Sequence, residues 1–247
     1  MRQVLTTLAL VAVCFAAPVN SSAQITTLWD QQPDLSLTPV IDQDIPVPAD
    51  AFSTYLVNDA TFGSDVNINS VTTFFTNSSN TWSGLITDGV LNIFDGDRLV
   101  GSDDVTSGGD FGLGSVSLSV TDLGNNVLAV TASNLNINLA AGTYFIGLSP
   151  SLLSSTDSQE FRYDSGTTVG SNTFARNPGG AFGFGTGFFD ADELSVGYAD
   201  AAFTITGKEV PEPTTAGLLA LGLVGLCLLY TSPSPRDQRG SRMPSSA

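Results

Sequence analysis

Two stretches of this chain alternate strictly between apolar and polar side chains. Residues 116–120 read Val-Ser-Leu-Ser-Val, and residues 135–139 read Leu-Asn-Ile-Asn-Leu. Successive side chains of a β-strand point to opposite faces, so this period of two predicts antiparallel strands with one buried and one solvated face. Turn-forming residues recur about every 8–12 residues around them, a spacing typical of a β-sandwich or jelly roll.

Further strands are predicted where β-branched and aromatic residues lie between turn residues. They comprise an edge strand around Leu28 and Trp29, residues 66–75, 90–94, 127–131, 144–148 and 161–163, and closing strands at 194–198 and 202–206. Residues 122–126 and 141–142 are expected as turns, and residues 207–210 as a linker. The predicted fold is therefore all-β, with residues 24–209 forming one antiparallel β-sandwich or jelly-roll ectodomain.

The first 23 residues have the layout of a secretory signal peptide. Arg2 precedes an apolar run over residues 4–17, and small residues lead to a cleavage site between Ala23 and Gln24. An uncleaved N-terminal anchor is the alternative. The sequence therefore predicts an exported domain that begins at Gln24.

The predicted exported domain is strongly acidic and contains no cysteine. Residues 24–209 carry four basic side chains against 22 acidic ones, a net charge of −18. Such a surface repels nucleic acid, so nucleic acid is not an expected partner. The two cysteines, Cys14 and Cys227, lie in the apolar ends of the chain. The stability of the domain must therefore come from its core rather than from disulfides.

A conformationally restricted Pro-Glu-Pro segment precedes an apolar run near the C-terminus. Pro211 and Pro213 hold the backbone extended and expose Glu212 between them, so a helix can begin only after Pro213. The uncharged run that follows is near the lower length limit for a membrane-spanning helix, and its glycines favour a membrane helix over the alternative of a buried core helix. The predicted anchor, within a segment spanning residues 210–229, comprises Ala216, Gly217, Leu218, Leu219, Ala220, Leu221, Gly222, Leu223, Val224, Gly225 and Leu226.

This segment resembles the PEP-CTERM sorting signal, whose Pro-Glu-Pro motif matches Pro211, Glu212 and Pro213. The resemblance implies a bacterial protein that the helix holds in the inner membrane until an exosortase recognises the signal. An exosortase is a membrane-embedded, cysteine-dependent, transpeptidase-like enzyme. The resemblance also implies association with exopolysaccharide, and a final location at the cell-envelope surface or in the extracellular matrix.

The sequence departs from the family pattern after the helix. The family signal ends in a compact arginine cluster, which keeps the helix end in the cytoplasm. Here Arg236, Arg239 and Arg242 are dispersed among Pro, Ser and Asp. Residues 230–247 resemble translated sequencing-adapter read-through, so we treat them as a non-native tail and exclude them from fold reasoning.

Several chemistries are excluded by composition. The chain has no histidine, which excludes Ser-His-Asp and Cys-His catalysis and histidine-ligated zinc. The absence of cysteine between residues 24 and 209 excludes thiolate metal sites there. The pair Gly112 and Gly114 lacks the third glycine and the helix of a phosphate-binding loop. We therefore predict that the protein is not an enzyme. Calcium is the one cofactor for which the sequence offers candidate ligands.

Two groups of carboxylates are candidate calcium ligands, because calcium takes six to eight oxygen ligands. The first group comprises Asp95, Asp97, Asp103, Asp104 and Asp110. The second group comprises Asp190, Asp192 and Glu193. The alternative interpretation is turn chemistry, since aspartate favours turns in any protein.

Two alternative functions stay open. A carbohydrate-binding module would stack sugar rings on Trp29, Trp82 or the aromatic residues between Phe182 and Phe189. The favoured interpretation of the glycine-aromatic segment 177–189 is instead a hairpin or bulge region whose rings cover its glycines. A polysaccharide-cleaving glycosidase needs only two carboxyl groups. Glu160 and Glu193 are the only glutamates in the strand-bearing region.

Overall fold

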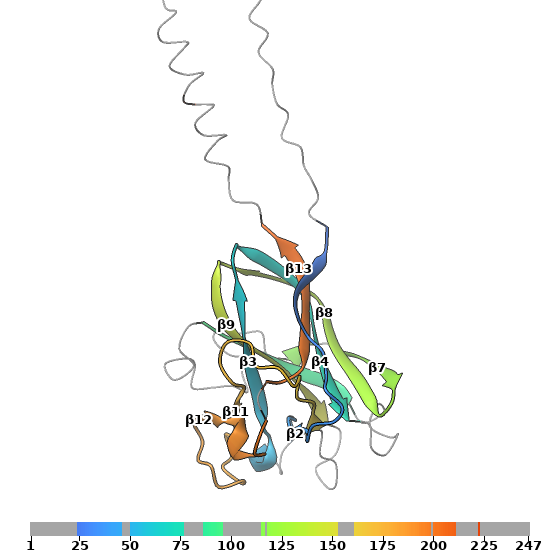
Figure 1. The fold of residues 1–247 in the computed structure, drawn as a ribbon, viewed down its shortest axis with the longest axis vertical. Coiled ribbons are helices and arrows are strands. Elements are labelled where there is room, and N and C mark those ends of the chain that lie inside the picture. Colours follow the sequence, from blue (N-terminus) through green and yellow to red (C-terminus); the bar gives the residue numbers. More distant parts are fainter. Residues whose placement is uncertain are drawn as a thin grey trace, which may run out of the picture.

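The structure is a computed structural model, and it describes residues 24–45, 50–76, 86–95, 115–116, 118–152, 161–198, 200–210 and 222. Within these residues the protein is all-β, and its strands form two antiparallel sheets (Figure 1). The predicted all-β, sandwich-like fold is therefore confirmed, while its jelly-roll connectivity stays a prediction. The signal peptide, and the C-terminal helix apart from Gly222, lie outside the described residues.

The first sheet is built around β4 (Val66–Thr76). On one side β4 pairs with β8 (Val127–Leu139), which pairs in turn with β7 (Leu118–Gly124). On the other side it pairs with β13 (Phe203–Glu209) and, beyond the end of that strand, with β10 (Phe161–Arg162). Two further strands, β1 (Thr26–Gln31) and β2 (Val40–Ile41), pair with β13 and β10 respectively.

The second sheet has the order β12 (Phe188–Asp190), β11 (Phe174–Arg176), β3 (Tyr55–Phe62), β9 (Gly142–Leu152), β5 (Ile86–Asp95) and β6 (Ser115–Val116). Two short 3-10 turns flank it: η1 (Asp50–Phe52) precedes β3, and η3 (Ala191–Glu193) follows β12. A parallel bridge between Asp44 and Ser151 ties the chain after β2 to β9, so the two sheets are joined at this point.

The main apolar core lies between the two sheets. Phe75 of β4 and Leu128 of β8 come from the first sheet, and Leu91 of β5 and Ile146 of β9 come from the second; all four are fully buried. Burying an apolar side chain of this size contributes roughly 1.5–3 kcal/mol. Because the described strands bring together about twenty such residues without a disulfide, the core carries the stability, as the composition predicts.

The outer face of the first sheet is polar around Thr72, Thr131, Asn67 and Asn138, whereas Phe74, Val127 and Ala129 form a small apolar cluster on it. The hydroxyls of Thr72 and Thr131 lie 2.9 Å apart across β4 and β8, and Asn67 donates to the side-chain oxygen of Asn138 at 2.8 Å. Cross-strand polar pairs of this kind stabilise a sheet by a few tenths of a kcal/mol to about 1 kcal/mol each. They also keep this part of the face hydrated, while the opposite face of the sheet packs into the core.

One long strand replaces two predicted ones. Residues 127–131 and 135–139 both belong to β8, which continues through the intervening residues. Asn134 and Asn136 adopt positive φ values of 60° and 52°, which asparagine tolerates better than most residues. The pairing register with β4 shifts between Ile68 and Ser70, so the strand absorbs the irregular residues as a bulge instead of ending.

The alternating stretch 116–120 is divided between the two sheets. β6 pairs with β5 in the second sheet, whereas β7, which begins at Leu118, pairs with β8 in the first. Strands that change sheets in this way form the corners of sandwiches. The period of two therefore predicts the strand character of these residues correctly but does not reveal the change of partner.

Two predicted elements are wrong. Residues 194–198 form turns instead of a strand: the Leu194 N–H donates to the carbonyl of Ala191 at 3.0 Å, and Gly197 has a φ of 89°, outside the extended region. Residues 207–209, expected in a linker, continue β13. They can do so because Gly207 has no Cβ, which would lie 2.3 Å from the carbonyl oxygen of Asn67.

The two ends of the described domain lie at the same pole. β1 and β13 are paired neighbours, with Thr26 opposite Gly207, and Figure 1 shows the opposite pole occupied by β2, β11 and β12. We call the pole near Thr26 and Glu209 the proximal pole and the opposite one the distal pole. The N-terminal and C-terminal neighbours of the domain therefore both attach on its proximal side.

Replacing Gly147 with alanine tests how closely β9 approaches β3. A Cβ at this position would lie 1.9 Å from the carbonyl oxygen of Leu56, and backbone cannot move aside cheaply. We expect Gly147→Ala to lower the free energy of unfolding by about 3 kcal/mol, measured by urea denaturation. Gly63→Ala is the matched control, because a Cβ at Gly63 meets nothing within 4 Å. Equal stability of the two variants would contradict this close approach.

Candidate functional site

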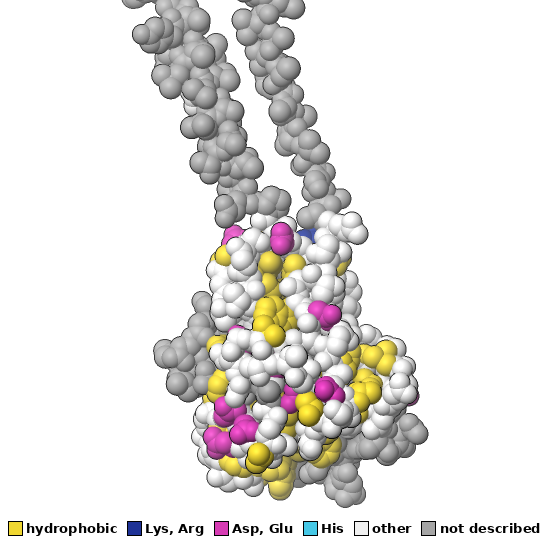
Figure 2. Space-filling view, viewed as in Figure 1, with side chains coloured by type: hydrophobic (Ala, Val, Ile, Leu, Met, Phe, Trp, Pro, Cys, Tyr) yellow, Lys and Arg dark blue, Asp and Glu magenta, His cyan; other side chains and the backbone are white. Residues whose placement is uncertain are grey.

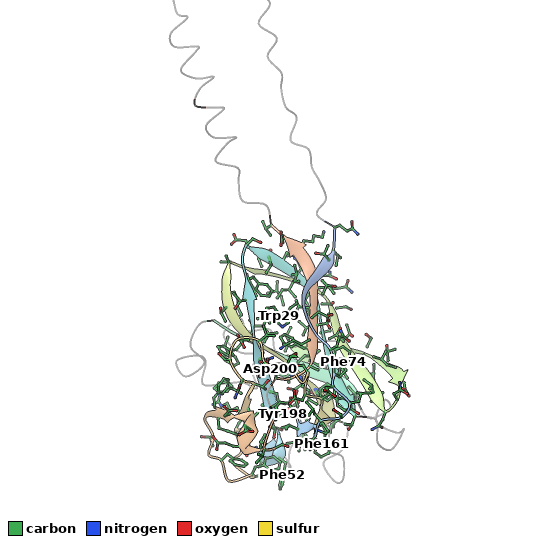
Figure 3. All side chains as sticks on the ribbon, in the orientation of Figure 1. Trp29, Phe52, Phe74, Phe161, Tyr198 and Asp200 are labelled. Carbon is green, nitrogen blue, oxygen red and sulfur yellow. The ribbon has the colours of Figure 1, made fainter. Side chains whose placement is uncertain are left out.

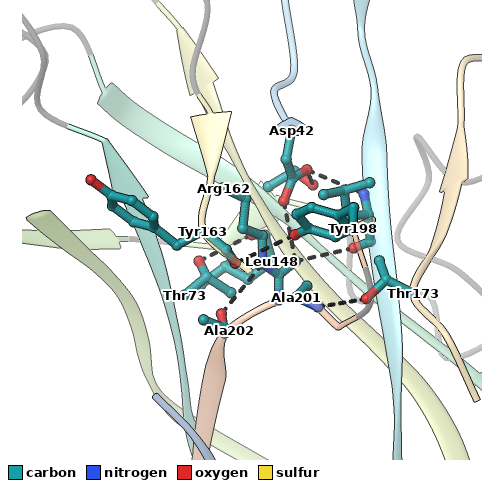
Figure 4. A network of polar contacts seen from close by, with 11 residues as sticks. Asp42, Thr73, Leu148, Arg162, Tyr163, Thr173, Tyr198, Ala201 and Ala202 are labelled. Atoms are coloured by element: carbon teal, nitrogen blue, oxygen red, sulfur yellow. Dashed lines mark hydrogen bonds and ion pairs between the residues drawn. The ribbon is translucent and has the colours of Figure 1, made fainter. Parts of the chain in front are cut away.

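A buried ion pair connects the two sheets. The Arg162 Nη1 atom of β10 lies 3.1 Å from Asp42 Oδ2, just after β2, and both side chains are fully buried. The same nitrogen donates to the carbonyl of Leu56 in β3 at 3.3 Å, and Nε donates to the carbonyl of Ala202 at 3.5 Å. The guanidinium group therefore contacts both sheets (Figure 4).

Asp42 has further donors around its carboxylate. Its Oδ1 accepts hydrogen bonds from the Ser149 hydroxyl of β9 and from the Leu56 N–H at 3.2 Å. Burial raises the pKa of Asp42 above its ordinary value, whereas the Arg162 charge and these hydrogen bonds act in the opposite direction. Desolvating two charges costs several kcal/mol, so each partner is stable in the core only because the other is present.

A second polar cluster lies beneath the loop of residues 165–171. Asp200 Oδ2 accepts from Gln31 Nε2 at 2.9 Å and from the Val169 N–H at 2.6 Å. Asp59 of β3 accepts from the Ser171 N–H at 3.0 Å. Burial raises the pKa of Asp200 to about 6, with a smaller contribution in the same direction from the neighbouring Asp59 and Asp164. The two carboxylates thus hold the loop by its backbone.

The centre of the described domain holds more negative than positive side chains. Its almost fully buried acidic residues are Asp42, Asp59, Asp164 and Asp200, against the single buried cation Arg162. The Oδ1 atoms of Asp200 and Asn58 are buried without a hydrogen-bond partner. Among the described residues no three acidic, histidine or cysteine side chains are grouped to hold a metal ion. Protonation of the Asp200 carboxylate would reduce this excess of buried negative charge.

A groove of about 340 Å³ opens at the distal pole, and we call it the distal groove. Its apolar lining includes Pro39, Phe161, Phe182, Phe184 and Leu194, and its polar side chains are Thr38 and Ser195. Figure 3 shows Phe52 and Phe161 at this end of the molecule, and Figure 2 shows apolar and acidic side chains gathered close together there. Volumes of this size accommodate small ligands or one or two side chains.

The glycine-aromatic segment forms the hairpin that its glycines favour. β11 and β12 pair directly, with Phe174 opposite Asp190, and residues 177–187 form the loop between them. Phe184 stacks on Phe189 with ring centroids 4.9 Å apart, and Phe182 meets Phe52 edge to face at 6.0 Å. The rings therefore form two braced pairs rather than one flat row. Trp29 packs instead against the core, 6.3 Å from Phe203.

Most of the predicted site residues cannot be placed. The predicted sorting residues Pro211, Glu212 and Pro213 lie outside the described residues, as do Ala23, Trp82, Glu160 and the predicted calcium ligands Asp97, Asp103, Asp104 and Asp110. Asp95 ends β5, but its side chain is not described, and Gln24 is exposed at the proximal pole. Within the described residues no helix has the length and apolar character to cross a membrane.

The second acidic group performs turn chemistry. Asp190 caps η3 by accepting from the Asp192 N–H at 3.0 Å, and Asp192 accepts from the Gly197 N–H. Glu193 is exposed, and no carboxylate is among the residues lining the distal groove. Asp190 and Asp192 thus make the hydrogen bonds that the turn interpretation expects.

Sequence reasoning missed the buried ion pair. Arg162 is one of only four basic residues between positions 24 and 209, and it stands between Phe161 and Tyr163. A lone arginine inside an apolar strand is a signal of a buried partner, because burial of an unpaired charge is too costly. The identity of that partner, Asp42, 120 residues earlier, was not recoverable from the pattern.

No protein-family model matches the chain, and no curated protein matches it either.

Removing the Arg162 cation should leave the buried Asp42 carboxylate without its ion-pair partner. We expect Arg162→Met to destabilise the fold by about 3–5 kcal/mol, because an uncompensated carboxylate stays in the core. Adding Asp42→Asn to this variant should recover part of the loss, which a double-mutant cycle by urea denaturation measures. Additive effects of the two substitutions would show that the pair does not act as a unit.

The pKa of Asp200 predicts a pH dependence of stability. Its folded value of about 6 exceeds the ordinary 3.8, so its stabilising contribution is complete below about pH 3.8 and is lost as the pH rises through 6. Asp200→Asn keeps an oxygen acceptor but cannot ionise. We therefore expect this variant to gain stability relative to wild type between about pH 4 and about pH 7.5. Urea midpoints at both values test this, and an unchanged difference would contradict it.

Proposed function

We propose that this chain is an exported bacterial protein that its C-terminal Pro-Glu-Pro signal addresses to the cell envelope. The observation that carries the proposal is the segment from Val210 to Leu229, in which Pro211, Glu212 and Pro213 precede an uncharged apolar run. On this proposal the apolar run holds the protein in the inner membrane until an exosortase recognises the signal. The domain then becomes part of the cell-envelope surface or extracellular matrix, in association with exopolysaccharide.

The shape of the described domain supports such tethering. β13 ends at Glu209, and the Val210 N–H still donates to the carbonyl of Asp65 at 2.7 Å, so the signal follows the last strand directly. Because Thr26 pairs with Gly207, the predicted signal peptide and the predicted anchor both join the proximal pole. A domain attached in this way presents its distal pole away from the membrane.

The two alternative functions keep their status as predictions. The distal groove gives a carbohydrate-binding module a place for sugar rings, since Phe184 is 39% exposed there. Its polar side chains, however, are only two hydroxyls. A glycosidase requires two facing carboxyl groups, and the described lining of the groove provides none. Sorting to the envelope is therefore the function that we propose.

Replacing Pro211, Glu212 and Pro213 together with alanine tests the proposal. In a bacterium that carries an exosortase, we expect the wild-type chain to leave the inner-membrane fraction in an exosortase-dependent manner. The alanine variant should stay there, because the rigid exposed step that we assign to recognition is gone. Cell fractionation and immunoblotting measure the distribution.

Replacement of Pro33 and Pro39 with alanine provides a matched control, because it removes the same residue type from the body of the domain. Deletion of the exosortase gene should reproduce the alanine phenotype for the wild-type chain. If the alanine variant and the wild-type chain distribute identically in both hosts, the proposal is wrong.

A further inference from the structure

We propose that the distal groove is a docking site for a protein segment that carries an apolar side chain next to lysine or arginine. The sorting proposal does not assign this groove, and the inference does not depend on it. Three observations carry it: the groove is preformed, exposed apolar side chains surround it, and acidic side chains border it.

The groove is preformed because its rings are held in place. Phe184 has one face stacked on Phe189, at an interplanar angle of 22°, and lines the groove with the rest of its surface. Phe182 is supported edge to face by Phe52. A ring already fixed by a neighbour loses little conformational entropy on binding, which is what an anchor pocket requires.

Exposed apolar side chains continue beyond the groove. Phe52 is 49% exposed beside Phe182, and Val196 is 96% exposed one residue after Ser195 of the lining. Contiguous apolar surface with a polar rim is typical of protein-binding sites, because removing apolar surface from water is favourable. The patch lies at the distal pole, away from both attachment points of the domain.

The charge beside the groove selects a basic partner. Asp192 and Glu193 are exposed and directly precede Leu194 of the lining. Neither carboxylate forms an ion pair with a described basic residue: Arg162 is buried with Asp42, and Lys208 lies in β13 near the proximal pole. Complementary charges steer encounter and exclude acidic partners.

The same lining disfavours a sugar as the occupant. Sugar recognition needs several hydrogen-bonding side chains around the ring, because each buried hydroxyl must find a partner. The groove offers the hydroxyls of Thr38 and Ser195, and every other lining side chain is apolar. An aromatic or aliphatic side chain leaves no polar group unpaired there, so a protein segment fits this chemistry better.

The test uses the full chain in lipid nanodiscs and a phage library of random dodecapeptides. We expect the enriched peptides to share an aromatic or aliphatic residue flanked by lysine or arginine. A synthetic copy of the most enriched peptide, measured by fluorescence anisotropy, should lose about tenfold in affinity on Phe184→Ser. Glu193→Gln should cost about threefold and weaken the dependence on salt.

Two further variants make the result unambiguous. Val196→Ser, at a side chain too exposed to support the fold, should also weaken binding, so the proposal stays testable if Phe184→Ser unfolds the domain. Leu123→Ser, at a 54% exposed apolar residue beside the β7–β8 turn, is the matched control and should leave the affinity unchanged. The proposal is overturned if no peptide is enriched, if binding ignores these substitutions, or if neutral oligosaccharides occupy the groove instead.

Discussion

The buried pair of Arg162 and Asp42 is the interaction on which the arrangement of the two sheets depends. β2 and β10, which lie at or next to the two charges, are only two residues long, so their backbone pairing alone holds them weakly. The charges fix these short strands against β3 and β9, because the carbonyl of Leu56 accepts from Arg162 and the Ser149 hydroxyl donates to Asp42. Apolar packing alone would tolerate a small slide of one sheet over the other, whereas a desolvated guanidinium with defined acceptors does not. We infer that the pair determines how the sheets are aligned.

The long strands follow from local pattern, and several of the short ones do not. β4 and β9 were predictable because β-branched and aromatic residues fill them, and the edge position of β1 was predictable from its isolated run. β10 lies within the predicted strand 161–163, whereas β2 was not predicted, because its pairing with β10 joins segments 120 residues apart. Residues 194–198 mislead in the opposite way: their composition suits a strand, but the cap at Asp190 and the positive φ of Gly197 turn the chain.

The candidate sites divide in the same manner. The proposed sorting residues Pro211, Glu212 and Pro213 could be picked out from the sequence because they are contiguous. The distal groove is assembled from β2, β10 and the segments on either side of β12, and only the fold brings these together. The glycine-aromatic segment drew attention to Phe182 and Phe184, but it could not indicate Pro39 or Phe161 as their neighbours. Its braced ring pairs also show why a count of aromatic residues does not predict a flat stacking surface.

The pairing of β1 with β13 has a consequence for how the chain reaches its native state. A ribosome or a translocation channel delivers the chain from its N-terminus, so β1 emerges first and its partner emerges last. Until β13 arrives, β4 has one bare edge and β1 has no partner in the sheet, and exposed edges of this kind invite pairing with other chains. Closure also needs contacts across almost the whole domain, which makes folding slow. β1 therefore stays unpaired for longer than any other described strand, and protection by chaperones matters most during that time.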